Sequence, residues 1–449
     1  MLRGVHLDLK GCPPTPSRLL ELTELFAALD FNLVLVEWED TFPWTVDERF
    51  RSPTAYSQTE VQEFCSKAEE LGLELVPLVQ CLGHMENPLS VEGYAHLREV
   101  EDMESGLDPV LSESRDLILA MVDDVLSLMP GVRRFHLGGD EARTLGKGMR
   151  SQPFMEKHGK GKLYLNHVEP LLDHLNARGV RPLLWHDMMI DWDKSDLEKL
   201  ATRSDLMPWS YGGDPASDGD HCHEGMIKRF KKAGFSLWGA GAYKGAEGYD
   251  AESPDLSLHI ENAVGWMKLA DQYEFKGVVA TAWSRYAVDT IQCNPIDSSL
   301  DSLLLVAEVF RTGHAPEGKS EEVMKRLEAL GTGKRFLACR DVMDTLARLK
   351  KEGWEKVQHA RQVLVLARRD PKRTSSRNPK LGLHAMVRLG EVVEEGDVLV
   401  EKAKKAFEGL MDIIWIEEYF ETRVEPLKTE YREIVGQYRS LMDIKGENL

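Results

Sequence analysis

The chain alternates between two kinds of segment, and this alternation is the feature that most limits its possible fold. Short apolar runs rich in β-branched residues are each followed by a longer stretch with helical periodicity. The runs that we expect to form strands are eight: Gly4–Leu9, Asn32–Trp38, Glu74–Leu82, Arg134–Gly138, Arg181–His186, Leu206–Ser210, Ser236–Ala240 and Gly277–Trp283. Several are almost continuously apolar, which is typical of parallel strands covered on both faces. Eight strand–helix units predict an α/β fold that closes into a (β/α)₈ TIM barrel.

Local signals support this reading. Ser57-Gln58-Thr59-Glu60 has the spacing of a capping box, and the helix that begins there is expected to end before Gly72. Further helices are expected to end at Pro130-Gly131, Gly179, Gly234 and Gly313, because a left-handed C-cap favours glycine. The structural alternative is an open doubly wound sheet. That fold would place a glycine-rich phosphate-binding turn after the first strand, where this chain has two prolines, Pro13 and Pro14.

The pattern changes after about Gly313, which predicts a second domain. From Ser320 to Ile444 we find amphipathic stretches and no strand pattern; the stretches are Val342–Val365, Ala385–Leu410 and Trp415–Met442. We therefore expect a catalytic barrel over residues 1–314 and a smaller all-helical C-terminal domain over residues 315–449. The basic run Arg368–Arg377 is interpreted as a solvated loop between helices. The helices are expected to pack on the barrel or to form a homodimer.

Charge and composition restrict the partners. A net charge of −19 disfavours nucleic acid and anionic membranes, and no apolar run is long enough to predict a membrane span. The first residues lack the pattern of a signal peptide, and six scattered cysteines without CxxC spacing indicate reduced thiols in a cytoplasmic protein. The run His221-Cys222-His223-Glu224 is interpreted as a helix start, since consecutive residues rarely converge on one metal ion. We expect neither a metal nor another cofactor.

Polar and aromatic residues gather where the predicted strands end. In a barrel, these carboxyl ends meet at one face, where catalytic groups lie. The residues at these ends include Asp8, Glu37, Glu39, Asp40, His84, Glu86, Asp140, Glu141, Trp185, Asp187, Trp209, Tyr211, Trp283, Arg285 and Tyr286. Tryptophan and tyrosine rings stack on the C–H faces of sugars, while carboxylates and arginine bind hydroxyl groups. The mixture predicts a carbohydrate pocket and is unlike a phosphate site, which would require lysine and exposed amides.

The strongest single motif is Phe135-His136-Leu137-Gly138-Gly139-Asp140-Glu141. Neighbouring residues of a strand point to opposite faces, so two adjacent carboxylates can serve one site only where the strand ends. The two glycines permit such an irregular backbone and leave room for a ligand. The structural alternative is an acidic helix N-terminus, which the helix dipole would favour.

These residues resemble a known family. The run from His136 to Glu141 is similar to the signature of glycoside hydrolase family 20. Three further segments resemble the hexosaminidase D branch of that family: Val5–Gly11, Glu37–Pro43, and Pro77–Gln80 with Gly83–Glu86. So do Leu237-Trp238 and Lys244-Gly245-Ala246. The resemblance covers essentially the whole chain and weakens after about residue 315. It implies an exo-β-N-acetylhexosaminidase that removes terminal N-acetylgalactosamine or N-acetylglucosamine.

The resemblance also implies a mechanism, in which the sugar's own 2-acetamido oxygen is the nucleophile of a retaining reaction with an oxazolinium intermediate. Glu141 is then the general acid and base, and its pKa is expected to be raised. Asp140 orients the acetamido group, and Tyr211 binds its oxygen. The residues implied to enclose the acetamido group and the sugar ring are Trp185, Trp209 and Trp283. Those implied to bind the outer hydroxyls of the sugar are Arg3, Glu39 and Asp40. His84 either orients the acidic pair or is a core histidine, whereas His136 is expected to be core.

One position departs from the family. Most members have Trp-x-Glu at the eighth strand, whereas here Arg285 stands two residues after Trp283. Arg285 is therefore an expected substrate contact, and the choice between glucosamine-type and galactosamine-type sugars stays open. Two other functions are also open: a barrel glycosidase with two catalytic carboxylates, the second being Asp187 or Glu39, and a catalytically silent carbohydrate-binding barrel.

Overall fold

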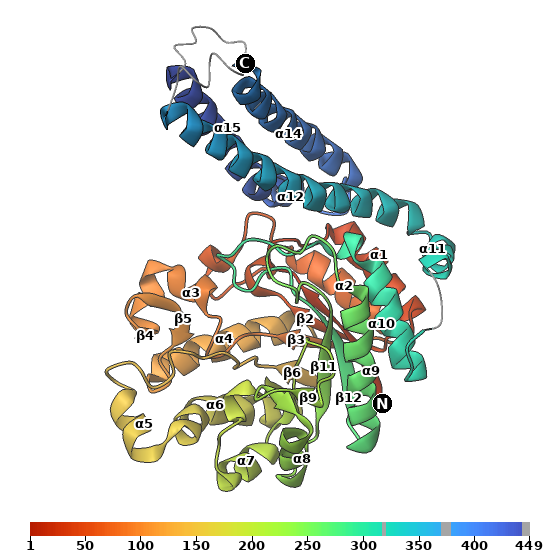
Figure 1. Cartoon of the computed structure of the whole chain (residues 1–449). Helices are drawn as coiled ribbons and strands as arrows, with labels where there is room; N and C mark the ends of the chain where they lie inside the picture. Colours follow the sequence, from red (N-terminus) through yellow and green to blue (C-terminus); the bar gives the residue numbers. More distant parts are fainter. Residues whose placement is uncertain (317–319, 370–378, 442–449) are drawn as a thin grey trace.

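The computed structural model describes residues 1–316, 320–369 and 379–441, and Figure 1 shows a barrel from which a long helical bundle extends. Eight parallel strands form the barrel in the order β11-β12-β1-β2-β3-β6-β7-β8. Their bounds are β1 Leu2–Asp8, β2 Leu33–Glu37, β3 Glu74–Leu78, β6 Arg134–His136, β7 Arg181–Trp185, β8 Asp205–Met207, β11 Trp238–Lys244 and β12 Gly277–Ala282. Isolated parallel bridges Leu206–Leu237 and Trp209–Ala240 join β8 to β11 and complete the circle.

All eight expected strands are present, so the predicted (β/α)₈ barrel is confirmed. The seventh strand is displaced: the expected Ser236–Ala240 is observed as Trp238–Lys244. This run, Trp-Gly-Ala-Gly-Ala-Tyr-Lys, lacks a β-branched residue, so its sequence does not mark the strand. Its position is set instead by pairing with β12, with a bulge between Ala242 and Lys244.

One helix follows each strand and covers the outside of the barrel. These helices are α1 Pro16–Ala28, α2 Gln58–Glu70, α4 Ser112–Leu128, α6 Lys160–Ala177, α7 Lys194–Ala201, α8 Glu224–Lys232, α9 Leu256–Gln272 and α10 Leu300–Thr312. The capping box of Ser57 and Glu60 at the start of α2 is confirmed, as is the left-handed C-cap at Gly313. Shorter insertions lie between strand and helix: α3 Glu86–Ser90, the hairpin β4 Arg98–Val100 with β5 Met103–Leu107, α5 Gln152–His158, and β9 Ser217–Asp218 with β10 Cys222–His223.

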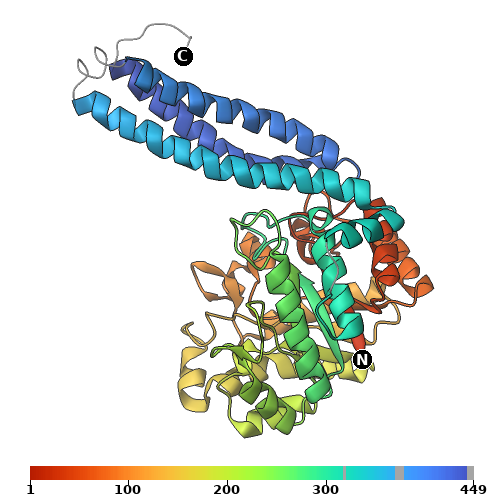
Figure 2. The same cartoon turned by 45° about the vertical axis from the view of Figure 1, so that its right-hand side comes forward.

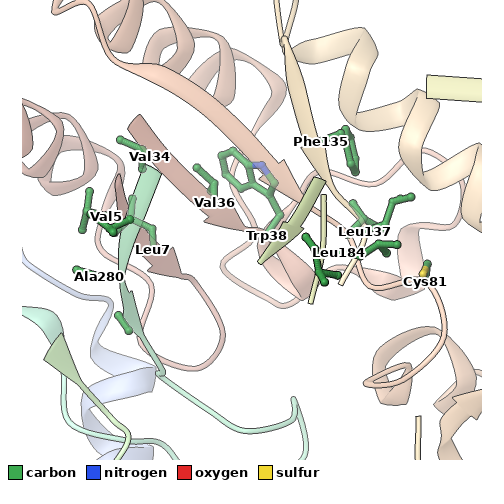
Figure 3. Close-up of a cluster of buried hydrophobic side chains, with 14 of the residues drawn as sticks. Val5, Leu7, Val34, Val36, Trp38, Cys81, Phe135, Leu137, Leu184 and Ala280 are labelled. Atoms are coloured by element: carbon green, nitrogen blue, oxygen red, sulfur yellow. The ribbon is translucent and has the colours of Figure 1, made fainter. Parts of the chain in front are cut away.

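The strands divide the core into two layers. Alternate side chains such as Leu33, Leu35 and Trp185 fill the barrel interior. Their neighbours, including Val34 and Val36, point outward against the helices, and Figure 3 shows part of this outer cluster. Burial on both faces explains why these strands have continuous apolar sequences.

The C-terminal region is helical, as expected. It consists of α11 Ser320–Ala329, α12 Gly333–Arg369, α14 Pro379–Ala406 and α15 Ile413–Leu441. In both views the three long helices lie side by side and extend away from the barrel (Figure 2). Arg368 and Arg369 end α12, and the remainder of the expected basic loop lies outside the described residues.

The boundary expected near residue 314 stays a prediction. The apolar core of the barrel includes Val323, Leu327 and Phe336, which come from α11 and the start of α12. Conversely, Cys12 follows β1 but packs in the core of the long helices. Each of the two regions therefore contributes residues to the apolar core of the other. Within the described residues, no helix is long and apolar enough to span a membrane.

Candidate active site

A cavity of about 550 Å³ opens at the carboxyl ends of the barrel strands. This volume is typical of a small-ligand site. Its lining residues come from all eight strands: six strands contribute through the loops that follow them, and β2 and β7 contribute Glu37 and Trp185 at their ends. They are Lys10, Glu37, Gln80, His84, Glu86, Met103, Ser105, Asp140, Glu141, Arg143, Trp185, Trp209, Tyr211, Ala246, Tyr249, Trp283, Tyr286 and Ala287.

The adjacent carboxylates Asp140 and Glu141 both line this cavity because the backbone turns sharply after β6. Gly138, Gly139 and Glu141 all have positive φ angles, of 58°, 77° and 41°. A Cβ at Gly139 would lie 2.2 Å from the hydroxyl of Tyr164, and one at Gly138 would lie 1.8 Å from the side-chain oxygen of Gln80. Glycine is therefore required at both positions, and the expected irregular strand end is present.

His84 lies between the two carboxylates. Its Nε2 is 3.4 Å from an oxygen of Asp140 and 3.4 Å from an oxygen of Glu141. Burial alone would lower the pKa of His84, but the charge of Asp140 and the contacts with both carboxylates outweigh it and raise this pKa well above its usual value. The raised pKa favours the charged form of His84, and its contacts with both carboxylates are consistent with the orienting role; the choice between that role and a satisfied core histidine stays a prediction.

The protonation of Glu141 differs from the expectation. The contact with His84 lowers the pKa of Glu141, and the contact with Arg143 lowers it further. Because these two effects exceed the opposing effect of burial, this pKa is about 2. The guanidinium of Arg143 donates a hydrogen bond of 2.7 Å to Oε1 of Glu141. The expected rise of this pKa does not occur here because two cationic side chains face the carboxylate.

Asp187 holds the backbone of the segment that carries Asp140 and Glu141. Its Oδ2 accepts a hydrogen bond of 2.9 Å from the backbone N–H of Glu141. Burial and the nearby charge of Asp140 raise the pKa of Asp187 to about 7. Asp187 is absent from the residues that line the cavity, so it fixes the backbone of Glu141 and does not face the ligand space.

Aromatic rings form one side of the cavity. Tyr211 stacks on Trp209 with ring centroids 5.2 Å apart, and it lies 6.1 Å from Trp283. Trp185 lies 6.4 Å from Trp283. The structure therefore brings together these four aromatic residues, to which the sequence analysis gave contacts with the sugar or its acetamido group, and their faces suit the C–H surface of a sugar or the methyl of an acetamido group.

Lys10 and Glu37 are cavity residues to which the sequence analysis gave no role. The ammonium of Lys10 lies 2.6 Å from Glu37 and 3.0 Å from Asp8, and all three side chains are buried. Burial opposes the charged form of each group, but the pair overcomes it: the pKa of Lys10 is raised and that of Glu37 is lowered. The signal in the sequence was their position: Glu37 stands at the end of the second expected strand, and Lys10 follows the first.

Arg3 does not fit its expected role. It lies at the beginning of β1, whereas the cavity lies beyond Asp8 at the end of that strand. The five residue steps from Arg3 to Asp8 separate these ends by roughly 16 Å. The guanidinium of Arg3 donates to the carbonyl of Asp30 at the opposite face of the barrel, 3.0 Å away.

Arg285 also does not fit the expected substrate contact. Its side chain is 6% exposed and points toward the C-terminal helices, where it pairs with Glu418 and lies over the ring of Trp415. Glu39 and Asp40 are likewise absent from the residues that line the cavity. Burial raises the pKa of Glu39 to about 8 and that of Asp40 to about 6, against the opposing charge of nearby cations.

His136 and His223 have structural roles. His136 is buried, accepts a hydrogen bond of 3.0 Å from the backbone N–H of Gly138, and packs 4.3 Å from the ring of Trp185. The side chain of His223 caps α8 by accepting from the N–H of Met226, so the run from His221 to Glu224 is indeed a helix start. Across the described residues, no group of three or more His, Cys, Asp or Glu side chains could hold a metal ion.

A (β/α)₈ barrel with two carboxylates, one histidine and an aromatic wall at its carboxyl face defines a glycoside hydrolase. Comparisons with known proteins specify the family. The model for "Glycosyl hydrolase family 20, catalytic domain" matches residues 35–225. The chain is 36% identical over 333 residues to hexosaminidase D of Bos taurus, covering 72% of this chain and 95% of the relative. It is 36% identical over 340 residues to hexosaminidase D of Homo sapiens, covering 73% and 68% of the two chains.

The chain therefore belongs to glycoside hydrolase family 20, in its hexosaminidase D branch, and is a β-N-acetylhexosaminidase. Solved structures support the fold alone. The chitobiase of Flavobacterium johnsoniae aligns with a TM-score of 0.56 at 16% identity, covering 100% of this chain and 73% of the other. The β-N-acetylhexosaminidase of Bacteroides fragilis aligns with a TM-score of 0.54 at 16% identity, covering 73% and 69%.

Proposed function

We propose that the enzyme removes terminal β-linked N-acetylhexosamine units with retention of configuration, and that the substrate's acetamido oxygen is the nucleophile. The observation that carries this proposal is the unequal environment of the two adjacent carboxylates. The side chain of Asp140 is 9% exposed and that of Glu141 is 34% exposed, although both contact His84. The deeper carboxylate suits the acetamido group, and the outer one suits the bond to be broken.

In the first step the acetamido oxygen attacks the anomeric carbon, and the bond to the leaving oxygen breaks. Glu141 gives its proton to that oxygen. Asp140 accepts the acetamido N–H and balances the positive charge of the oxazolinium ion. Its Oδ1 is buried without a hydrogen-bond partner within the described structure, so an acceptor is available. In the second step Glu141 takes a proton from water, which attacks the anomeric carbon and reopens the ring.

Glu141 must hold a proton before the first step. Arg143 is the neighbour that can withdraw, because its side chain is 75% exposed. When the leaving oxygen takes its place beside Glu141, the loss of the cation raises the pKa of Glu141. Tyr211 binds the acetamido oxygen, Trp185, Trp209 and Trp283 enclose the acetamido methyl and the sugar ring, and Lys10 with Glu37 binds the outer hydroxyls.

The two-carboxylate alternative is less well supported. Asp187 is occupied by the backbone of Glu141, and its pKa of about 7 leaves it largely protonated below neutral pH, which makes it a poor nucleophile. Glu39 is absent from the residues that line the cavity.

A stable thiazoline mimic of the oxazolinium ion tests the proposal. It should inhibit competitively and bind far more tightly than the free sugar, since it resembles an intermediate that the site stabilises. A substrate with a 2-hydroxyl in place of the acetamido group should not be cleaved. Turnover of the 2-hydroxyl substrate at a similar rate, without inhibition by the thiazoline, would favour two catalytic carboxylates.

A further inference from the structure

The mouth of the cavity has an aromatic wall that is built by two loops. Tyr249 belongs to the loop of residues 245–255 between β11 and α9, and Tyr286 follows β12. Their rings lie 4.7 Å apart. The hydroxyl of Tyr286 donates to the carbonyl of Gly245 at 2.9 Å and accepts from the N–H of Gly248 at 3.1 Å, which joins the two loops. Tyr249 is 36% exposed, in contrast to Trp185 deep in the cavity at 1%.

The same loop sends a second side chain in another direction. The carboxylate of Glu252 is fully buried among the C-terminal helices. Lys350 of α12 lies 2.7 Å from it, Arg423 of α15 lies 2.9 Å from it, and the hydroxyl of Tyr419 donates to it. One loop carboxylate thus gathers two cations and a phenol from two helices that lie outside the barrel.

Further contacts strengthen this attachment. The hydroxyl of Ser253 donates to Asp344 of α12 at 3.0 Å. Arg423 also donates to the backbone carbonyl of Gln292 in the loop after β12, and Arg285 of that loop pairs with Glu418 of α15. Both loops that build the mouth wall are therefore fastened to the C-terminal helices.

Within the barrel the loop is held by polar contacts: Glu247 lies 2.7 Å from His259 of α9 and accepts the backbone N–H of Asp255, and Tyr286 bonds Gly245 and Gly248. Apolar packing contributes little. The loop sequence, Gly-Ala-Glu-Gly-Tyr-Asp-Ala-Glu-Ser-Pro-Asp, contains no large apolar residue besides Tyr249 itself, which is partly exposed. Two glycines increase the entropy that ordering the loop must overcome. Polar, glycine-containing segments with few buried apolar contacts open readily unless they are anchored. The buried ion pairs of Glu252 supply the anchor to the C-terminal helices.

We propose that the C-terminal helices position the mouth wall for the leaving part of the substrate, a second sugar, and that Glu252 is the positioning residue through which they act. This rests on the proposed function, in which the reacting sugar lies beside Asp140 and the leaving part extends through the mouth. The exposed faces of Tyr249 and Tyr286 are suited to the C–H surface of that second sugar. Glu252 itself does not touch the substrate.

The test compares variants of the full chain with a disaccharide that carries a terminal β-linked N-acetylhexosamine. Glu252→Gln keeps the shape and removes the charge. It should raise KM for the disaccharide by about 10-fold, which is the order expected for a lost aromatic contact. The inhibition constant of the free N-acetylhexosamine product should change less than about twofold, because that sugar occupies only the inner site.

A double-mutant cycle with Tyr249→Ala adds a readout that general damage would not produce. Tyr249→Ala alone should raise the same KM, and adding Glu252→Gln should raise it no further, because the wall is already lost. Arg361→Gln is the matched control: Arg361 of α12 pairs with Glu430 of α15 at 2.6 Å, joining the same helices without touching either loop. It should leave both constants unchanged.

Glu252→Gln leaves two cations without their full countercharge, so it can fail to fold. In that case Lys350→Met replaces it in the test, because this variant keeps the contacts of Glu252 with Arg423 and Tyr419. Equal rises of KM and of the product's inhibition constant, additive effects in the cycle, or an unchanged KM in every folded variant would overturn the inference. A wild type that cleaves the disaccharide but ignores the thiazoline would contradict the proposed mechanism and leave this comparison valid.

Discussion

The exposed guanidinium of Arg143 donates a hydrogen bond of 2.7 Å to Glu141, the carboxyl group that we propose as general acid. Arg143 stands two positions after Glu141, whose φ angle is positive, and both side chains line the cavity. The pair places a removable cation beside the group whose proton the reaction requires.

Arg143→Gln should shift the pH dependence of the enzyme. The free enzyme is active when Glu141 holds a proton, so kcat/KM falls as pH rises through the pKa of that group. Contact with His84 and with Arg143 keeps this pKa at about 2, and removing Arg143 raises it. The alkaline limb of kcat/KM should therefore move to higher pH by about one unit. Arg150→Gln, which breaks an unrelated pair with Asp108, is the control; a limb that moves to lower pH contradicts the assignment.

Glu141→Gln should leave the fold intact and abolish most activity toward substrates with poor leaving groups. General-acid catalysis contributes about 10²–10⁴-fold. Activated aryl glycosides need less protonation and should lose less. Steady-state rates with a series of leaving groups of different pKa measure this difference, and equal losses across the series would give Glu141 another role.

Asp140→Asn should lower kcat with a smaller change in KM, because the charge of Asp140 is needed most near the transition state. We expect a loss of about 3 kcal/mol in transition-state stabilisation, typical of one preorganised electrostatic partner. Replacing the substrate's N-acetyl by N-trifluoroacetyl weakens the attacking oxygen and should slow the wild type steeply. An unchanged kcat with the fluorinated substrate would argue against attack by the acetamido group.

Lys10→Met should both destabilise the barrel and weaken substrate binding. The substitution removes the lysine charge that Asp8 and Glu37 share and leaves Glu37 with its contact to His6 alone. Removing one partner from such a buried cluster costs about 3–5 kcal/mol of unfolding free energy, measurable by urea denaturation. Lys67→Met, which breaks only pairs with Glu24 and Glu70 near the surface, should cost much less. Equal losses for both lysines would mean that the buried cluster is not a special feature of the fold.

Truncation after Gly313 should give an insoluble or strongly destabilised barrel. It removes Val323, Leu327 and Phe336 from the barrel's own apolar core and leaves Glu252 without Lys350, Tyr419 and Arg423. Solubility and thermal unfolding of the truncated and full chains provide the measurement. A soluble truncated chain with full activity would refute the structural role of the helices.

The homodimer stays a prediction from the amphipathic C-terminal stretches, and the cytoplasmic location stays a prediction from the cysteine pattern and the first residues. The preference between N-acetylgalactosamine and N-acetylglucosamine also stays open. Arg285, the residue on which that question first turned, faces Glu418 and not the cavity.

The sequence by itself determined the barrel and the acidic pair, because both depend on local rules. Buried parallel strands require continuous apolar runs such as Leu33–Glu37, and helix ends require residues such as Ser57 and Gly313. The turn that presents Asp140 and Glu141 requires Gly138 and Gly139, so this turn too can be predicted from residues that are adjacent in the sequence.

Only the tertiary structure decided where the long charged side chains point. Lys10, Arg3 and Arg285 all occur in or near strands that bound the barrel, yet one enters the cavity, one lies at the opposite face, and one reaches α15. Their directions depend on partners far away in the chain: the carboxylate of Glu37 for Lys10, the backbone carbonyl of Asp30 for Arg3, and the carboxylate of Glu418, 133 residues away, for Arg285. No local pattern encodes such pairings, because their energy exists only when folding brings the partners together.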